Sequence, residues 1–130
     1  LLDNELAMRD GDEHSFYDQF NKIVNIRHVV VCYDENKAVA CGAFKQYETG
    51  IVEIKRMFVH PDYRGKGIAS EVLKELEIWA SEIQYTNFVL ETGKNNPEAI
   101  ALYRKSGYEI IPNYGQYENI ESSICFEKEL

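Results

Sequence analysis

Residues 59–69 read VHPDYRGKGIA, and they join a stretch typical of a strand to a stretch typical of a helix. The preceding residues 51–59 (IVEIKRMFV) are rich in strand-forming side chains, and Pro61 ends this strand because proline donates no ladder hydrogen bond. The apolar residues that follow recur on one helix face, at Ile68, Val72, Leu76, Trp79 and Ile83. Most of the charged residues lie elsewhere on this helix, at Glu71, Lys74, Glu75 and Glu77. The segment therefore predicts a strand, a glycine-containing turn and an amphipathic helix in succession.

Two more strands are expected before this one, in residues 28–33 (HVVVCY) and 38–46 (AVACGAFKQ). Residues 34–37 (DENK) and 48–50 (ETG) are turn signals between the strands. Tight turns join antiparallel neighbours, so we expect these strands to form an antiparallel sheet with strand 51–59.

The chain after the helix repeats the alternation of strand and helix. Residues 86–91 (TNFVLE) form an expected strand, and the full helix before it favours a parallel crossover from strand 51–59. Asn96 followed by Pro97 is typical of a helix N-cap and a first helical position. This helix is expected to run to Ser106, with Gly107 as its left-handed stop.

The fold class that follows is α/β, or α+β, with a mixed and mostly antiparallel sheet, one parallel pair of strands and helices on both faces. The last two strands are expected near residues 108–111 and 122–128, and two helices are expected in residues 1–10 and 14–25. No repeat or linker interrupts this order, so residues 1–130 are expected to form a single domain.

The composition argues against several classes of function. The chain has 14 Lys and Arg against 22 Asp and Glu, a net charge of −8, whereas general nucleic-acid binding requires a basic surface. The clearest apolar runs, residues 29–32 and 38–44, are far shorter than the ~20 residues that cross a bilayer, so no membrane partner is expected. An acidic chain is compatible with a cationic substrate.

The cysteines and histidines show no metal-binding pattern. The cysteines are Cys32, Cys41 and Cys125, and the absence of a CxxC spacing favours reduced core thiols in a cytoplasmic protein. A catalytic thiol is the alternative. The histidines are scattered, at His14, His28 and His60, so no zinc site and no other metal is expected.

The turn Arg64-Gly65-Lys66-Gly67 has the composition of an anion site. Two glycines let the backbone approach a ligand closely, and the first amides of the following helix have no intrahelical acceptors. Arg64 and Lys66 add full charges at the positive end of the helix dipole, which suits a diphosphate. The alternative is a plain turn with solvated basic residues. The turn is not a Walker loop, because Gly67 follows Lys66, and Ser70 occupies the third glycine position of a dinucleotide fingerprint.

Two segments together resemble a known family. Val59-His-Pro-Asp-Tyr-Arg-Gly-Lys-Gly-Ile-Ala69 resembles the R/Q-x-x-G-x-G/A acyl-CoA signature of the GNAT superfamily of N-acetyltransferases. The second motif of that superfamily resembles the pattern Asn96, Ala99, Leu102, Tyr103, Gly107 and Tyr108. The resemblance covers nearly all of the chain from about residue 28, including the strand order. The superfamily begins with a strand that is not recognisable here, and since Leu1 is not a start methionine we expect that strand to be missing.

The resemblance implies an acetyl-CoA site. It places the pyrophosphate on the glycine-containing turn and the start of the helix, at Arg64, Gly65, Lys66, Gly67, Ile68, Ala69 and Ser70. It places the pantetheine arm along strand 51–59, at Met57, Phe58 and Val59, where this strand and strand 86–91 splay apart. Asn96, at the start of the next helix, is implied to contact acetyl-CoA as well.

Acetyl transfer to an amine needs a base, a donor to the oxyanion and a proton for the departing thiolate. The resemblance makes Tyr103 the acid beside the coenzyme A sulfur, whereas helical spacing alone is typical of core packing. Glu53 is the expected base, and the alternative is an ion pair with Lys55 or exposure on one face. Glu91 is the second choice and an expected substrate contact, and the Met57 N–H is the expected oxyanion donor.

The loop PNYGQY, residues 112–117, is expected either to line an acceptor pocket with Tyr114 and Tyr117 or to pack on itself. The implied function is transfer of acetyl from acetyl-CoA to the primary amine of a small molecule or an amino-acid-like acceptor, directly within a ternary complex. The alternatives are acetylation of protein lysines or N-termini, and a non-catalytic acyl-CoA-binding module. The superfamily often forms dimers, so a homodimer is also expected.

Overall fold

The computed structural model of this chain describes residues 28–130. The helices expected in residues 1–10 and 14–25 lie outside the described residues. Six strands form one mixed sheet in the order β1-β2-β3-β4-β6-β5. The elements are β1 (His28–Asp34), β2 (Lys37–Glu48), β3 (Ile51–Val59), α3 (Ile68–Glu82), β4 (Asn87–Gly93), α4 (Pro97–Lys105), β5 (Glu109–Ile111) and β6 (Ser123–Glu129), with short 3₁₀ turns at Pro61–Tyr63 and Gly115–Tyr117.

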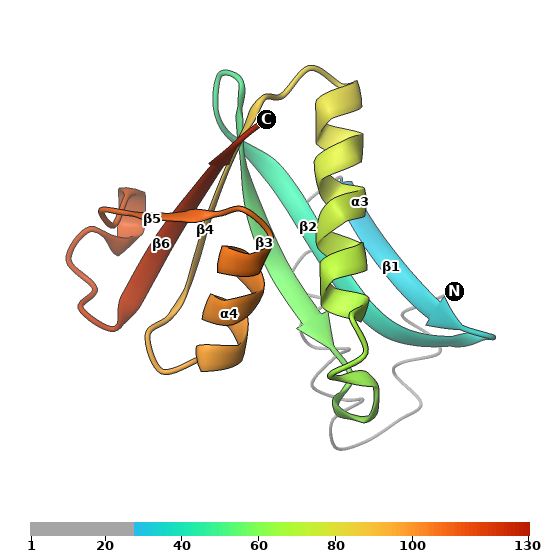
Figure 1. The fold of residues 1–130 in the computed structure, drawn as a ribbon. Coiled ribbons are helices and arrows are strands. Elements are labelled where there is room, and N and C mark those ends of the chain that lie inside the picture. Colours follow the sequence, from blue (N-terminus) through green and yellow to red (C-terminus); the bar gives the residue numbers. More distant parts are fainter. Residues whose placement is uncertain (1–27) are drawn as a thin grey trace.

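Both described helices cover the same face of the sheet (Figure 1). Val72 and Leu76 of α3 and Tyr103 of α4 belong to one buried cluster with side chains of the central strands. The strand residues in that cluster alternate along the chain, as Val52 and Ile54 do in β3. This alternation leaves Glu53 and Lys55 on the opposite face of β3.

The expected strand directions are confirmed. β1, β2 and β3 run antiparallel, with partners such as Val30 and Gly42 or Phe44 and Ile54. β3 and β4 are parallel, but they pair only at Ile51 with Asn87, Val52 with Phe88 and Glu53 with Val89. β3 continues to Val59 and β4 to Gly93 without further pairing between them in the described sheet. The two strands therefore splay apart after Glu53 and Val89.

A β-bulge at Arg56 interrupts β3, and no sequence pattern predicted it. The register with β2 shifts between Cys41 and Ala43, and Arg56 has a φ of 56°. Gly42 lies opposite the bulge, where an added Cβ would stand 2.5 Å from Met57 Sδ and 2.9 Å from Leu76 Cδ1. The absence of a side chain at Gly42 is thus what allows Met57 to pack against α3.

The buried face of α3 differs from the predicted face in two ways. Ile83 lies beyond the helix end as its C-cap and is 40% exposed, because α3 ends at Glu82. Glu77 is buried although it is charged, because Tyr108 Oη donates a 2.7 Å hydrogen bond to it and Lys128 Nζ lies 3.0 Å away. These partners belong to the half of the sheet beyond the splay, so Glu77 ties α3 to that half.

The expected ends of α4 are confirmed. Asn96 is its N-cap, with Oδ1 accepting a 3.1 Å hydrogen bond from the Ala99 N–H, and Pro97 is the first helical residue. Gly107 has a φ of +95° just after the helix. Within residues 28–130, no helix combines the length and apolar character needed to cross a bilayer.

Candidate active site

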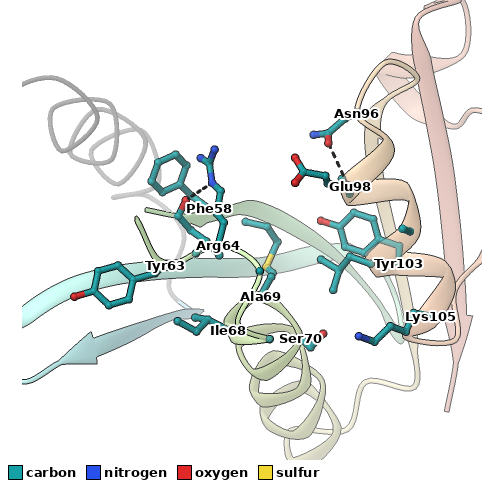
Figure 2. Close-up of a pocket in the computed structure, with 17 residues that line it drawn as sticks. Phe58, Tyr63, Arg64, Ile68, Ala69, Ser70, Asn96, Glu98, Tyr103 and Lys105 are labelled. Atoms are coloured by element: carbon teal, nitrogen blue, oxygen red, sulfur yellow. Dashed lines mark hydrogen bonds between the residues drawn. The ribbon is translucent and has the colours of Figure 1, made fainter. Parts of the chain in front are cut away.

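A cavity of about 640 Å³ opens between the end of β3, the start of α3 and one face of α4 (Figure 2). Its lining contains every residue that the family resemblance assigned to the co-substrate except Lys66: Met57, Phe58, Val59, Arg64, Gly65, Gly67, Ile68, Ala69, Ser70, Asn96 and Tyr103. The exposed Lys66 instead places its Nζ 5.3 Å from the ring centroid of Tyr63. The structure therefore brings nearly all of these residues to one concave site.

The turn before α3 has the geometry of an anion cradle. Gly65 and Gly67 have φ angles of +76° and +81°, and a Cβ at either position would meet nothing within 4 Å. Gly67 is the N-cap of α3, and no side chain caps the helix. The first amides of α3 are thus free of intrahelical acceptors and face the cavity at the positive end of the helix dipole.

Arg64 is positioned by the end of β3. Its Nε donates a 2.9 Å hydrogen bond to the Val59 carbonyl, and its guanidinium carbon lies 5.6 Å from the Phe58 ring centroid. These contacts hold a positive charge beside the glycine-containing turn, as Figure 2 shows. The turn, the helix start and Arg64 together fit a phosphate-bearing ligand.

A second cavity of about 320 Å³ lies on the other side of the splay. It is lined by Glu53, Lys55 and Arg56 of β3 and by Glu91 and Thr92 of β4, with Tyr117 from the loop between β5 and β6. The two cavities share four lining residues, namely Met57, Asn96, Ala99 and Tyr103. They therefore meet in the gap between β3 and β4.

Glu53 is 4% exposed and lies at the start of this gap. Tyr114 Oη donates a 2.7 Å hydrogen bond to its Oε2, and Lys55 Nζ lies 3.8 Å from its Oε1. Lys55 Nζ also donates a 3.3 Å hydrogen bond to Tyr117 Oη. The ion pair considered from the sequence is thus present, and the carboxylate faces the second cavity as well.

Tyr114 and Tyr117 both lie in the loop between β5 and β6, but they have different surroundings. Tyr117 lines the second cavity, whereas Tyr114 is absent from the lining of both cavities and contacts Glu53 instead. Tyr114 packs against Tyr47 and Tyr117, with ring centroids 5.1 and 5.6 Å apart. Burial and the bonded Glu53 carboxylate raise the pKa of Tyr114, so it remains a hydrogen-bond donor.

Tyr103 is a core residue and a cavity residue at once. It is 6% exposed, and its ring centroid lies 5.9 Å from that of Tyr108 and 5.8 Å from that of Phe126. Burial, and to a smaller extent the charge of Glu91, raise the pKa of Tyr103 to about 12. The phenol is therefore neutral at physiological pH and able to donate a hydrogen bond where the cavities meet.

Glu91 lies near the end of β4 and lines the second cavity. Ser123 Oγ donates a 2.5 Å hydrogen bond to its Oε2. This bond anchors Glu91 against β6, so the second cavity has a carboxylate on each of its two strands.

Sequence reasoning missed several lining residues. The first cavity also contains Tyr63, Glu98, Ala101, Leu102 and Lys105, and the second contains Arg56 and Thr92. Steps of three and four from Glu98 along α4 reach Leu102 and Lys105, so helical periodicity would have found this face. Arg56 had no such signal, because its place depends on the bulge.

These features define the acyl-CoA N-acyltransferase fold: a mixed sheet with a splayed parallel pair and a glycine-containing turn at the start of a helix. The family model described as "Acetyltransferase (GNAT) family" matches residues 3–108, and the chain belongs to this family.

Similar proteins agree with this assignment. The "IAA acetyltransferase" of Azospirillum brasilense is 39% identical over 93 residues, which cover 71% of this chain and 61% of the relative. A Klebsiella pneumoniae structure, provisionally named an acyl-CoA N-acyltransferase, has 27% identity and a TM-score of 0.77, covering 93% of this chain and 91% of that one. A GNAT family acetyltransferase from Elizabethkingia anophelis with acetyl-CoA bound shares the fold, with 18% identity, a TM-score of 0.74 and 87% and 82% coverage. The chain spans about three fifths of the length of the Azospirillum relative.

Proposed function

We propose that this protein transfers an acetyl group from acetyl-CoA to the primary amine of a small molecule or an amino-acid-like acceptor. The observation that carries the proposal is the meeting of two cavities at Met57 and Tyr103, in the gap between β3 and β4. The first cavity has an anion cradle that suits acetyl-CoA, and the second has carboxylates that suit an amine. Both substrates would therefore reach the point where the two cavities meet. This arrangement suits direct transfer in a ternary complex.

Acetyl-CoA supplies an acetyl group activated as a thioester. On this proposal, Arg64, the turn around Gly65 and Gly67, and the first amides of α3 bind the pyrophosphate. β3 and β4 do not pair beyond Glu53 and Val89 in the described sheet, and the two cavities meet there beside Met57, where the pantetheine arm would run. The acetyl-CoA-bound Elizabethkingia protein, which has the same fold, supports this choice of co-substrate.

Glu53 would accept the proton of the amine. A general base must be within hydrogen-bond reach of its substrate, and Glu53 faces the acceptor cavity at the start of the splay. Tyr114 and Lys55 offset the cost of burying its charge and fix the direction of its carboxylate. Glu91 remains the second candidate for the same role.

Tyr103 would donate a hydrogen bond to the departing sulfur. Its pKa of about 12 lies above the ~8.5 of a free thiol, so complete proton transfer to a thiolate would cost about 5 kcal/mol. A hydrogen bond from the neutral phenol stabilises the leaving group without that cost. Tyr103 is therefore proposed as a donor to the sulfur, and coenzyme A would leave as a thiolate that takes its proton from water.

The size of the acceptor, the location of the protein and its oligomeric state are also part of this proposal. The second cavity, at about 320 Å³, favours a small acceptor over a long peptide. Free thiols at Cys32, Cys41 and Cys125 favour a cytoplasmic location. The homodimer implied by the family resemblance is tested by light scattering.

The deciding experiment follows thiol release from acetyl-CoA by the intact chain, with amines, polyamines, amino acids and peptides as acceptors. We expect release only when a suitable amine is present, with a mass increase of one acetyl group on that amine. Calorimetric binding of coenzyme A without release for any acceptor would instead establish a binding module. Release with peptides alone would favour a protein acetyltransferase.

A further inference from the structure

Arg56 occupies an unusual position on the acceptor side of the splay. Its φ of 56° lies in the left-handed region, which residues other than glycine seldom adopt. A bulge re-aims the side chains around it, and the residue lines the second cavity. Such backbone strain often accompanies a functional site.

The side chain of Arg56 has an unmet hydrogen-bonding group. Its Nε is buried and has no hydrogen-bond partner, alone among the buried side-chain nitrogens and oxygens of residues 28–130. A guanidinium stays charged at every physiological pH, and a buried donor without an acceptor costs free energy. The Nε is closed to solvent, so a ligand in the second cavity would bind the other N–H groups of the guanidinium.

The other charged groups of the second cavity already have partners. Glu53 is bonded by Tyr114 and lies beside Lys55, and Glu91 accepts a hydrogen bond from Ser123. Lys55 is engaged by Glu53 and by Tyr117. Arg56 is therefore the one cation of this cavity that has no carboxylate partner among the described residues. It lies three residues along β3 from the candidate base Glu53.

We infer that Arg56 binds a carboxylate of the acceptor, and that the acceptor is an aminocarboxylic acid. This inference rests on the proposed function, because it assigns the amine of the same molecule to Glu53. A carboxylate matches the charge of Arg56, for which residues 28–130 provide no carboxylate partner. A phosphate, with nearly two negative charges at neutral pH, would add unbalanced charge beside Glu53 and Glu91. The volume of about 320 Å³ is sufficient for a molecule of amino-acid size.

Matched pairs of acceptors test this assignment in the intact chain. Each amino acid is compared with its own primary amide, which keeps the amine and nearly the same shape but lacks the carboxylate charge. We expect a kcat/KM about 10- to 100-fold higher for the acid, the range for a hydrogen bond to a charged group. The amide has the more easily deprotonated amine, so amine basicity does not account for such a preference.

Substitutions at Arg56 attribute the preference to this side chain. We expect Arg56→Gln to bring the ratio of acid to amide near one, because only the acid has a carboxylate for this side chain to bind. Arg56→Lys keeps the charge and retains part of the ratio. The control is Arg104→Gln, because Arg104 is exposed on α4 and lines neither cavity. An equal rate for acid and amide in the wild type, or an unchanged ratio in Arg56→Gln, would overturn the inference.

Equilibrium binding separates this inference from the proposed function. Calorimetry with the protein saturated with coenzyme A is expected to show tighter binding of the acid than of the amide, and loss of that difference in Arg56→Gln. Absence of thiol release with every amine would contradict the proposed function and leave the binding comparison valid. Equal affinities for acid and amide in the wild type would overturn the carboxylate subsite whether or not turnover is seen.

Discussion

Tyr114 Oη donates a 2.7 Å hydrogen bond to Glu53 Oε2, across 61 residues of sequence. The bond joins the loop between β5 and β6 to the central strand β3, just where β3 and β4 cease to pair. Glu53 is 4% exposed, so its charge is tolerable only because Tyr114 and the ammonium of Lys55 compensate it. Tyr114 thus supports the candidate base from outside the acceptor cavity.

Replacing Glu53 by Gln is expected to lower kcat by about 10²- to 10⁴-fold, the usual contribution of a general base. The amide has the same shape and accepts the Tyr114 hydrogen bond, but it cannot take a proton from the amine. Steady-state thiol release measures the effect, with acetyl-CoA binding expected to change little. Glu48→Gln, at an exposed site in β2, is the control. Full activity of Glu53→Gln would transfer the role of base to Glu91.

Replacing Tyr114 by Phe is expected to lower the free energy of unfolding by about 1–3 kcal/mol, because it leaves a buried carboxylate with one partner fewer. Urea unfolding measures this change. Tyr33→Phe is the control, since Tyr33 is 49% exposed. Equal stability of Tyr114→Phe and the wild type would show that water replaces the phenol at Glu53.

Local sequence signals predicted the elements that frame the site. Pro61 ends β3, Gly67 precedes α3, and Asn96 with Pro97 begins α4, because each of these residues acts on the backbone within a few positions. The antiparallel and parallel pairs followed from the lengths of the connections. Most of the lining of the first cavity was expected from the family resemblance, whose two motifs cover the end of β3, the turn before α3 and much of α4.

Features that depend on contacts distant in sequence were not predicted. The bulge at Arg56 exists because Gly42, on the neighbouring strand, leaves room for Met57. Glu77 is buried because Tyr108 and Lys128 reach it from the far half of the sheet. The sequence around Arg56 does not indicate Gly42, and the sequence around Glu77 does not indicate Tyr108 or Lys128. Because Arg56 lines the second cavity, the acceptor side of the site was predicted only in part.

Replacing Gly42 by Ala is expected to destabilise the protein by about 1–3 kcal/mol, the usual cost of overpacking. The new Cβ would stand 2.5 Å from Met57 Sδ and 2.9 Å from Val72 Cγ1. Met57 lines both cavities, so its displacement is also expected to weaken coenzyme A binding in calorimetry. Gly93→Ala is the stability control, because a Cβ there meets nothing within 4 Å. Equal stability of the two variants would mean that the helix and strand relax around the methyl group.

The raised pKa of Tyr103 predicts a loss of stability at high pH. Burial raises this pKa from 10.0 to about 12, whereas the phenol of the unfolded chain ionises near pH 10. Between these values the unfolded chain has released a proton that the folded chain keeps, so rising pH favours unfolding. The stability associated with Tyr103 is therefore complete below pH 10 and falls by about 1.4 kcal/mol per pH unit up to about pH 12.

Tyr103→Phe removes this dependence, and urea unfolding of both proteins from pH 9 to pH 11 measures it. Tyr108 and Tyr114 are present in both proteins, so their ionisation cancels in the comparison. We expect the stability of the wild type relative to Tyr103→Phe to fall by about 1 kcal/mol or more over this range. A constant difference for Tyr103→Phe would show that the Tyr103 phenol ionises near pH 10 in the folded protein, and water would then have access to the point where the two cavities meet.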